Sequence, residues 1–139
     1  MWNVIFKHVR RKRVRRRKPR RTSVKSRTHF LEYKERARAL VLGRIEHVNA
    51  LYKFSYGTVV IRNTVSRWGS CSSKHNLNFN YKIVLLPTHL ADYIIVHELC
   101  HLGQFNHSAK FWALVALADP DYVAHRAELK KIHSGTLLK

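Results

Sequence analysis

The stretch Ile94-Ile-Val-His-Glu-Leu-Cys-His-Leu-Gly-Gln-Phe-Asn-His107 decides how this chain is arranged. On a helix, His97 and His101 lie one turn apart on the same face, so both imidazoles can reach one metal ion, with Glu98 beside them. This is the H-E-x-x-H arrangement of zinc hydrolases. Two histidines on one helix face can also be ordinary polar neighbours. The residues before them, from Tyr93 to Val96, are apolar and predict a buried helix, where unpartnered polar groups are costly. The stretch therefore predicts a metal-binding helix.

A catalytic zinc site takes three protein ligands and keeps a fourth position for water, so a third ligand is required. His107 follows His97 by ten residues, the spacing seen in metzincins, and Gly103 between them can supply a left-handed turn that ends the helix. Metzincins place this glycine one position later and carry a methionine turn, whereas the only methionine here is Met1. The chain is therefore no metzincin. Carboxylate ligands from Glu128, Asp119 or Asp121 remain the alternative to His107.

The remaining histidines and the cysteine inside the motif are read as ordinary residues. His47 is expected to be a partly exposed helix residue, and His75, His125 and His133 to lie at the surface. Cys100 stands between the ligands and is interpreted as a small buried residue, because a fourth protein ligand would close the site to water.

Composition limits the class of protein. The chain has 139 residues, the size of one domain, and its hydrophobic content of 45% fits a globular protein. Two cysteines, Cys71 and Cys100, are too few for a disulfide framework, and no apolar run reaches membrane-spanning length. We expect a soluble cytoplasmic protein with no membrane contact, monomeric by default.

The net charge of +19 is concentrated near the N-terminus. We expect residues 1–27 to form a basic, extended and poorly packed arm, and residues 28–139 to form the folded domain. Such a block has phosphate polymers as natural partners, so the arm is a candidate for non-specific contact with nucleic acid or the ribosome; as an alternative, it is a solvated tail. Its basic residues are Arg10, Arg11, Lys12, Arg13, Arg15, Arg16, Arg17, Lys18, Arg20 and Arg21.

Periodicity outlines the elements of the domain. Apolar residues at three- and four-residue intervals predict an amphipathic helix from Thr28 to about Tyr52, and Thr58–Arg62 is β-branched enough for a strand. The next segment, from Arg67 to Asn80, has the composition of two short strands joined by a turn at residues 72–76. In this arrangement Leu77 and Phe79 lie on one face. In a protease the open edge of such a hairpin can hold an extended substrate. Its candidate substrate-binding residues are Gly69, Ser70, Cys71, Asn78 and Asn80.

The C-terminal half reads as helices. Residues 81–86 form a further strand or a connector that lines the core, and Thr88 is a plausible N-cap of the metal helix. Asn106 or Ser108 can cap a next helix over residues 111–117, whose apolar composition places it in the core. Asp119 and Pro120 end that helix, and a last helix runs from about Asp121 to His133.

Several motifs agree in order and spacing with a known family. They are Arg67-Trp68-Gly69-Ser70-Cys71-Ser72, Leu77-Asn78-Phe79-Asn80, the helix from Tyr93 to His101, Asn106-His107-Ser108, Phe111-Trp112 and Pro120-Asp121-Tyr122. Over residues 29–131 the chain resembles the YgjP-like metallopeptidases of bacteria and archaea, distant kin of SprT and Wss-type zincins. Relatives usually carry a longer β-rich N-terminal portion where this chain has its basic arm.

The resemblance implies an α+β fold: a compact zincin-like (minigluzincin-like) domain with a small, mostly antiparallel sheet packed on helices. It also implies one Zn²⁺ on His97, His101 and His107, with Glu98 as catalytic acid and base.

The leading hypothesis is therefore a zinc metallopeptidase that hydrolyses protein or peptide substrates, with a zinc-bound water as nucleophile. Tyr122 or Arg126 is a candidate oxyanion helper. SprT-type proteases act on proteins crosslinked to DNA, so nucleic-acid-associated proteins are candidate substrates of this chain. The alternatives are a nucleic-acid- or ribosome-binding protein with a structural zinc site and a non-proteolytic metal-dependent hydrolase.

Overall fold

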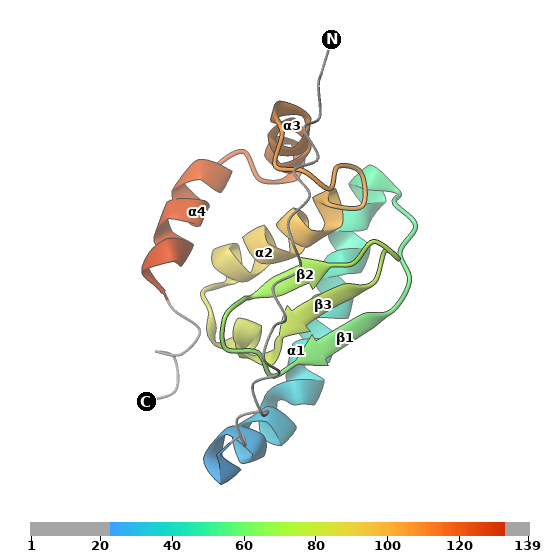
Figure 1. The fold of residues 1–139 in the computed structure, drawn as a ribbon. Helices are drawn as coiled ribbons and strands as arrows, with labels where there is room; N and C mark the ends of the chain where they lie inside the picture. Colours follow the sequence, from blue (N-terminus) through green and yellow to red (C-terminus); the bar gives the residue numbers. More distant parts are fainter. Residues whose placement is uncertain (1–22, 133–139) are drawn as a thin grey trace, which may run out of the picture.

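The computed structural model describes residues 23–132, which form four α-helices, a short 3-10 helix and a three-stranded sheet (Figure 1). Residues 1–22 and 133–139 lie outside the described part, and with them the ten basic residues of the predicted arm and His133. The elements, in order, are α1 (Val24–Tyr52), β1 (Val59–Arg62), β2 (Gly69–Cys71), β3 (Leu77–Asn80), η1 (Tyr81–Leu85), α2 (Thr88–Cys100), α3 (Ala109–Ala118) and α4 (Tyr122–Lys131). The predicted α+β class is confirmed.

The first helix begins earlier than predicted. Ser23 caps α1, its hydroxyl oxygen accepting a hydrogen bond from the backbone N–H of Ser26 at 3.2 Å. Residues 24–27, which the charge pattern placed in the arm, are therefore helical. The buried side of α1 carries Ala37, Val41, Ile45 and Val48, the spacing of one helix face.

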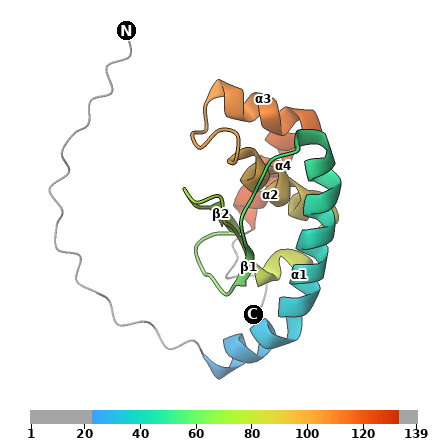
Figure 2. The same ribbon diagram turned by 90° about the vertical axis from the view of Figure 1, so that its right-hand side faces the viewer.

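The sheet is mixed, and the prediction of a mostly antiparallel sheet is wrong. Its strand order is β1-β3-β2, in which β2 pairs with β3 as the predicted antiparallel hairpin, whereas β1 pairs with β3 in parallel. A parallel partner comes from a distant part of the chain, so no local turn signal announces it. Helices α1 and α2 cover one face of the sheet, seen edge-on in Figure 2, and Leu77 and Phe79 point into this interface fully buried.

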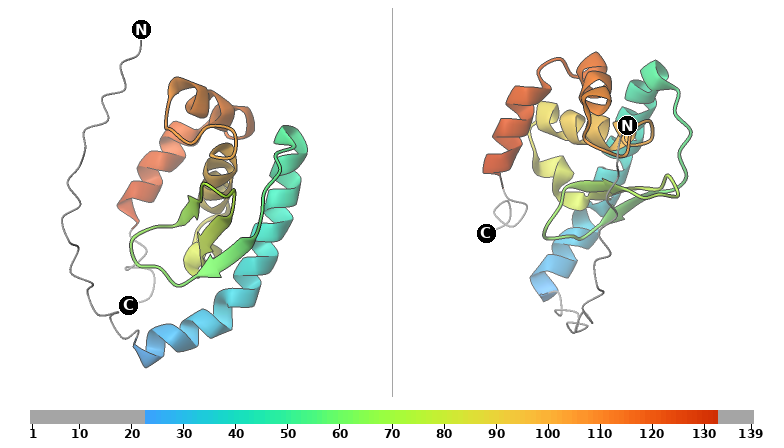
Figure 3. Two further views of the ribbon diagram at one scale, coloured as in Figure 1. Left: turned by 45° about the vertical axis from the view of Figure 1, so that its right-hand side comes forward. Right: turned by 45° about the horizontal axis from the view of Figure 1, so that its top comes forward.

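Helix α2 crosses behind the sheet between α1 and α4 (Figure 3). It is fixed to α1 by a bidentate ion pair, in which Arg44 Nε and Nη2 each donate to a carboxylate oxygen of Asp92 at 2.6 Å. Residues 81–85 before α2 form η1, a helical turn rather than a strand, which lines the core as the alternative interpretation predicted. Pro87, not Thr88, is the N-cap of α2, and it makes no side-chain capping bond.

The turn after α2 depends on Gly103 for a reason other than the predicted one. No glycine within residues 23–132 has a positive φ, so Gly103 is not left-handed. A Cβ there would instead lie 2.9 Å from Phe54 Cζ and 3.1 Å from Leu114 Cδ1. The glycine therefore allows the turn to pack closely against the segment after α1 and against α3.

The last two helices are less buried than their composition suggests. Ser108 caps α3, as one of the two predicted candidates, but only Phe111 and Val115 of α3 are fully buried and Leu117 is exposed. Helix α4 has no fully buried residue. It is connected to α2 through an ion pair between His89 and Glu128 at 2.9 Å. No helix in the described part of the chain is both long and apolar enough to cross a membrane.

A candidate metal centre

Three histidines meet at the C-terminal end of α2. His97 lies in the last turn of α2, His101 is its C-cap, and His107 lies just before α3. One nitrogen of each imidazole lies within 4.8 Å of the others, and the Nε2 atoms of His97 and His107 are 3.1 Å apart. It is the only such group of potential metal ligands among residues 23–132.

Local backbone structure explains how His107 reaches the other two. The backbone N–H groups of Gly103 and Gln104 both donate to the carbonyl oxygen of Cys100, at 3.1 and 2.9 Å, so the chain turns directly after the helix. Ser108 then starts α3, its hydroxyl oxygen accepting from the backbone N–H of Phe111 at 3.4 Å. His107 is therefore held between a tight turn and a capped helix.

Phe111 forms the floor of the group. Its ring centroid lies 5.0 Å from that of His97, 4.6 Å from that of His101 and 4.9 Å from that of His107. The Phe111 side chain is fully buried, so it limits how far each imidazole can turn. Sequence reasoning placed Phe111 in the core and missed this contact.

In two of the imidazoles, Nδ1 has a hydrogen-bond partner. His101 Nδ1 lies 3.1 Å from the carbonyl oxygen of Gln104, which can only accept, so Nδ1 carries the proton and Nε2 is free for a metal. His97 Nδ1 lies 3.4 Å from the hydroxyl of Tyr93, one turn earlier on α2. Tyr93 was missed as a site residue, although its position four residues before His97 already placed it on the same helix face.

Burial favours the neutral form of two of the imidazoles, which is the form that binds a metal. Burial lowers the pKa of His97 to about 3, and the nearby His101, His107 and Arg126 lower it further in that order. Burial is also the main cause that lowers the pKa of His101. Three imidazoles converge on one point with no fourth protein donor in the group, so they are placed to bind a metal ion and to leave a coordination position open.

Glu98 directly follows His97 on α2 and lies beneath strand β2. A Cβ on Gly69 would lie 2.7 Å from Glu98 Cγ and 2.9 Å from Glu98 Oε1, so the strand backbone rests directly on this side chain. Only 7% of Glu98 is exposed. Burial raises the pKa of Glu98 to about 8, against the charge of Arg67, which lowers it. A carboxyl group in this range can both accept and release a proton near neutral pH.

The predicted substrate-binding residues fall into two groups. Gly69, Ser70 and Cys71 make up β2, which is an edge strand, and Asn78 lies opposite Ser70 on β3. Asn80 is different, because it is buried and its amide nitrogen donates to the carbonyl oxygens of Thr64, at 2.8 Å, and Arg67, at 3.2 Å. Asn80 fixes the loop before β2 and is not available to a substrate.

Trp112 connects the two candidate oxyanion helpers, Tyr122 and Arg126, to the histidines. The ring of Tyr122 stacks on that of Trp112 with centroids 5.2 Å apart, and the guanidinium carbon of Arg126 lies 4.8 Å from the Trp112 centroid. Trp112 in turn stacks on His107 at 5.8 Å. Sequence reasoning identified Tyr122 and Arg126 but not the tryptophan that orients them.

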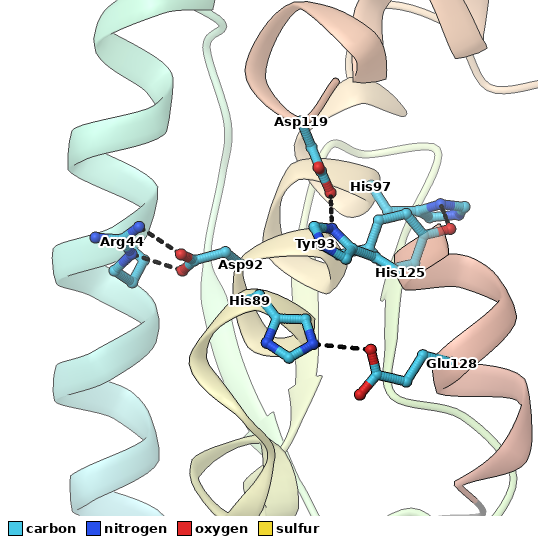
Figure 4. Close-up of polar contacts among 8 residues, drawn as sticks. All are labelled: Arg44, His89, Asp92, Tyr93, His97, Asp119, His125 and Glu128. Atoms are coloured by element: carbon cyan, nitrogen blue, oxygen red, sulfur yellow. Dashed lines mark hydrogen bonds and ion pairs between the residues drawn. The ribbon is translucent and has the colours of Figure 1, made fainter. Parts of the chain in front are cut away.

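The carboxylates considered as third ligands are engaged elsewhere or lie outside the group. Asp119 pairs with His125 at 2.8 Å and Glu128 pairs with His89 at 2.9 Å (Figure 4). Asp121 is exposed and does not join the group of potential ligands. His125 is therefore a partly buried, ion-paired residue rather than the surface residue predicted. His47 and His75 are exposed, as expected.

Comparison with known proteins agrees with this geometry. Residues 4–132 match the family described as YgjP-like, metallopeptidase domain. The metallopeptidase zymogen abylysin of Pyrococcus abyssi has a similar structure, with a TM-score of 0.60 and 22% identity over 66% of this chain and 92% of that one. The metallopeptidase zymogen jannalysin of Methanocaldococcus jannaschii has a TM-score of 0.57 and 18% identity over 66% of this chain and 94% of that one. No curated protein sequence matches significantly.

The contact between Gly69 and Glu98 predicts a steric effect. In Gly69→Ala the new methyl group overlaps Glu98, which is enclosed and cannot move away freely. We expect the free energy of unfolding to fall by about 1–3 kcal/mol, measured by chemical denaturation. Gly43→Ala is the matched control, because nothing lies within 4 Å of its Cβ position on helix α1. That change should raise the free energy by about 0.5–1 kcal/mol. Equal effects of the two changes would contradict the contact.

The pKa of Glu98 predicts a dependence of stability on pH. In the unfolded chain Glu98 loses its proton near its ordinary pKa of 4.5, whereas the folded protein keeps it until about pH 8. The folded state binds the extra proton, so this group makes the protein less stable as pH rises from about 5 to 8, by a few kcal/mol in total. Glu98→Gln removes the contribution.

Chemical denaturation of both proteins with a chelator present, between pH 5 and 9, measures this difference. The advantage of Glu98→Gln over the wild type should grow with pH. His97 acts in the opposite direction at lower pH, between its folded pKa of about 3 and the ordinary histidine pKa of 6.5, in both proteins. A constant difference across the range would show that Glu98 ionises freely in the folded state.

Proposed function

The chain belongs to the YgjP-like metallopeptidase family, and from this premise we propose that it is a zinc peptidase that hydrolyses peptide bonds at the three-histidine site. The observation that carries the proposal is the convergence of His97, His101 and His107 within 4.8 Å, beside a carboxyl group that is almost completely buried. The family supports a metal-dependent peptidase. The set of three imidazoles supports zinc as the ion.

Each residue of the site has a defined role in the proposal. His97, His101 and His107 hold the metal, oriented by Tyr93, Gln104 and Phe111. A zinc ion bound there supplies a Lewis acid, which polarises the scissile carbonyl and lowers the pKa of water to about 7. Glu98 removes a proton from the attacking water and later delivers it to the nitrogen of the leaving amine.

The burial of Glu98 supports its role in both proton transfers. An exposed carboxylate has a pKa near 4 and would be a poor proton donor to the leaving amine at neutral pH. Strand β2 shields Glu98 from water, and this raises its proton affinity. Arg67 limits the rise, since its positive charge favours the carboxylate.

The edge of β2 supports binding of an extended substrate. The backbone N–H of Asn80 donates to the carbonyl of Trp68 at 2.7 Å, and that of Ser72 donates to the carbonyl of Asn76 at 2.9 Å. Because main-chain groups alternate in direction along an antiparallel strand, those of Gly69 and Cys71 face away from β3. A peptide added at this edge would run directly above Glu98. Ser70 and Asn78, joined at 3.4 Å, can contact its side chains.

Arg126 is the better candidate for the oxyanion helper. Burial is the main cause that raises the pKa of Tyr93 and lowers that of His97, and the positive charge of Arg126, which lies on α4, acts on both groups in the lowering direction. Tyr122 lies stacked on Trp112 and supports the same wall. A cation here would stabilise negative charge that develops on the carbonyl oxygen.

Removing the base and removing a ligand should have different effects. Glu98→Gln keeps the three imidazoles, so we expect it to bind one equivalent of zinc and to lose peptide hydrolysis by a factor of about 10³ or more. His107→Ala removes a ligand and should lose both zinc affinity and activity. Metal analysis and cleavage of a denatured protein measure the two properties.

His47→Ala is the matched control, because His47 is an exposed histidine of α1 outside the ligand group. It should keep both zinc and activity. Full cleavage by Glu98→Gln would exclude Glu98 as the base. Phosphoester or amide turnover without peptide cleavage would instead support a non-proteolytic hydrolase.

The basic residues between Arg10 and Arg21 support a second, separate property. Their charge is suited to phosphate backbones, and binding through them would bring nucleic-acid-associated proteins to the site. These residues lie outside the described part of the chain, so the proposal rests on their sequence alone.

A truncated chain tests the property. Removing residues 1–22 keeps every residue of the described fold, including Ser23, which caps α1. We expect this truncation to keep peptide turnover and to lose salt-sensitive binding of single- and double-stranded oligonucleotides. Unchanged oligonucleotide binding would rule out the arm as the contact. Loss of peptide turnover would show that the arm belongs to the catalytic domain.

A further inference from the structure

A basic groove lies beside the metal centre, between the loop before β2 and helix α4. Its volume is about 350 Å³, and its lining includes Arg67, Trp68, Tyr93, Arg126 and Lys130. The lining residues come from the loop before β2, from α2, which carries Tyr93, and from α4. The mechanism proposed above gives roles to Arg67, Tyr93 and Arg126 of this lining, but none to Trp68 or Lys130.

The charged residues of the groove all have the same sign. Arg67, Arg126 and Lys130 contribute three cations, and the lining contains no carboxylate. Within residues 23–132 the ion pairs engage other side chains, including that of Glu128 on α4, which pairs with His89. The three cations therefore form no ion pair within the described structure, although collecting like charges around one groove is unfavourable.

Two residues of the groove wall connect it to the metal centre and to Glu98. The hydroxyl of Tyr93, in its wall, lies 3.4 Å from Nδ1 of His97. Trp68, also in its wall, directly precedes Gly69, the residue that rests on Glu98. A substrate strand that passes along β2 above Glu98 therefore has this groove beside it, within reach of a side chain or chain end next to the scissile bond.

We propose that the groove binds a substrate carboxylate next to the scissile bond, and that the enzyme therefore prefers peptides with an acidic residue or a free C-terminus at that position. This inference rests on the proposed peptidase function. Two guanidinium groups can bind a carboxylate in paired hydrogen bonds, and Lys130 adds a third charge. The apolar surfaces of Trp68, Leu129 and Ile132 can pack against the methylene groups of a glutamate.

The dimensions of the groove favour a single carboxylate over a nucleic acid backbone. A phosphate backbone needs an extended basic track, usually with stacking platforms along it. Here the three cations surround one volume of about 350 Å³, next to a site whose ligands and base suit peptide hydrolysis. Binding of nucleic acid in the groove is therefore the alternative that the test must distinguish.

The test compares matched peptides in the full-length zinc enzyme. One pair differs only in Glu or Gln next to the cleaved bond, with amidated C-termini, and a second pair has a neutral residue there with a free or an amidated C-terminus. We expect kcat/KM to be about three- to tenfold higher for one carboxylate peptide than for its neutral partner at low ionic strength, and the preference to shrink in high salt. A difference in rate within the first pair identifies a side-chain carboxylate, and a difference within the second pair identifies a free C-terminus. Equal rates within both pairs would overturn the proposal.

Variants of α4 localise the effect. Lys130→Gln should reduce the preference for the carboxylate peptide about two- to fivefold. Lys131→Gln removes the same charge from the next residue, which is exposed and does not line the groove, and should leave the preference unchanged. An equal reduction in both variants would attribute the preference to net charge and not to the groove.

Equilibrium binding separates this proposal from the peptidase function. If no peptide is cleaved, the proposed function fails, but calorimetric titration of the same peptides into zinc-loaded Glu98→Gln still compares their affinities. Tighter binding of a carboxylate peptide, weakened by Lys130→Gln, supports the groove without turnover. Equal affinities, or displacement by oligonucleotide with no peptide preference, would overturn it.

Discussion

Strand β2 rests on Glu98, and the position of this carboxyl group depends on the register of the sheet. Gly69 is the residue above it because Gly69 pairs with Phe79 and Ser70 with Asn78. A shift by one residue would bring Trp68 or Ser70 to that place, and neither side chain fits where a single Cβ already overlaps Glu98. Fully buried Phe79 fixes the orientation of β3, the strand against which β2 takes its register. The carboxyl group of Glu98 is therefore positioned by core packing.

The positive charge around the site serves the metal ligands as well as the proposed substrate. Burial is the main cause that lowers the pKa of His97, and Arg126 adds to this effect, which favours the neutral imidazole that binds a metal. Arg67 acts on Glu98 in the direction of the carboxylate. Both guanidinium groups also line the groove. The same two positive charges therefore disfavour protonation of His97 and of Glu98 and favour binding of an anionic group of the substrate.

The predictable features are those encoded by neighbouring residues. Helical spacing placed His97 and His101 on one face, and the short turn brought His107 to them. The hairpin of β2 and β3 followed from residues 72–76. Contacts between distant segments were not predicted from the sequence. They are the parallel pairing of β1, the packing of Phe54 against Gly103, and the hydrogen bond from the Asn80 amide to a loop. Asn80 looked like a substrate contact because its alternation with Phe79 gave no sign of that loop.

The three imidazoles and their aromatic floor come from one short segment, from His97 to Phe111. Bringing them together closes only small loops, which costs little chain entropy. Glu98, by contrast, is enclosed only after β2 has joined the sheet, which needs contacts between distant segments. The two parts of the site therefore differ in what they require of the fold. Local structure alone brings the three histidines together, whereas the enclosure of Glu98 depends on the whole domain.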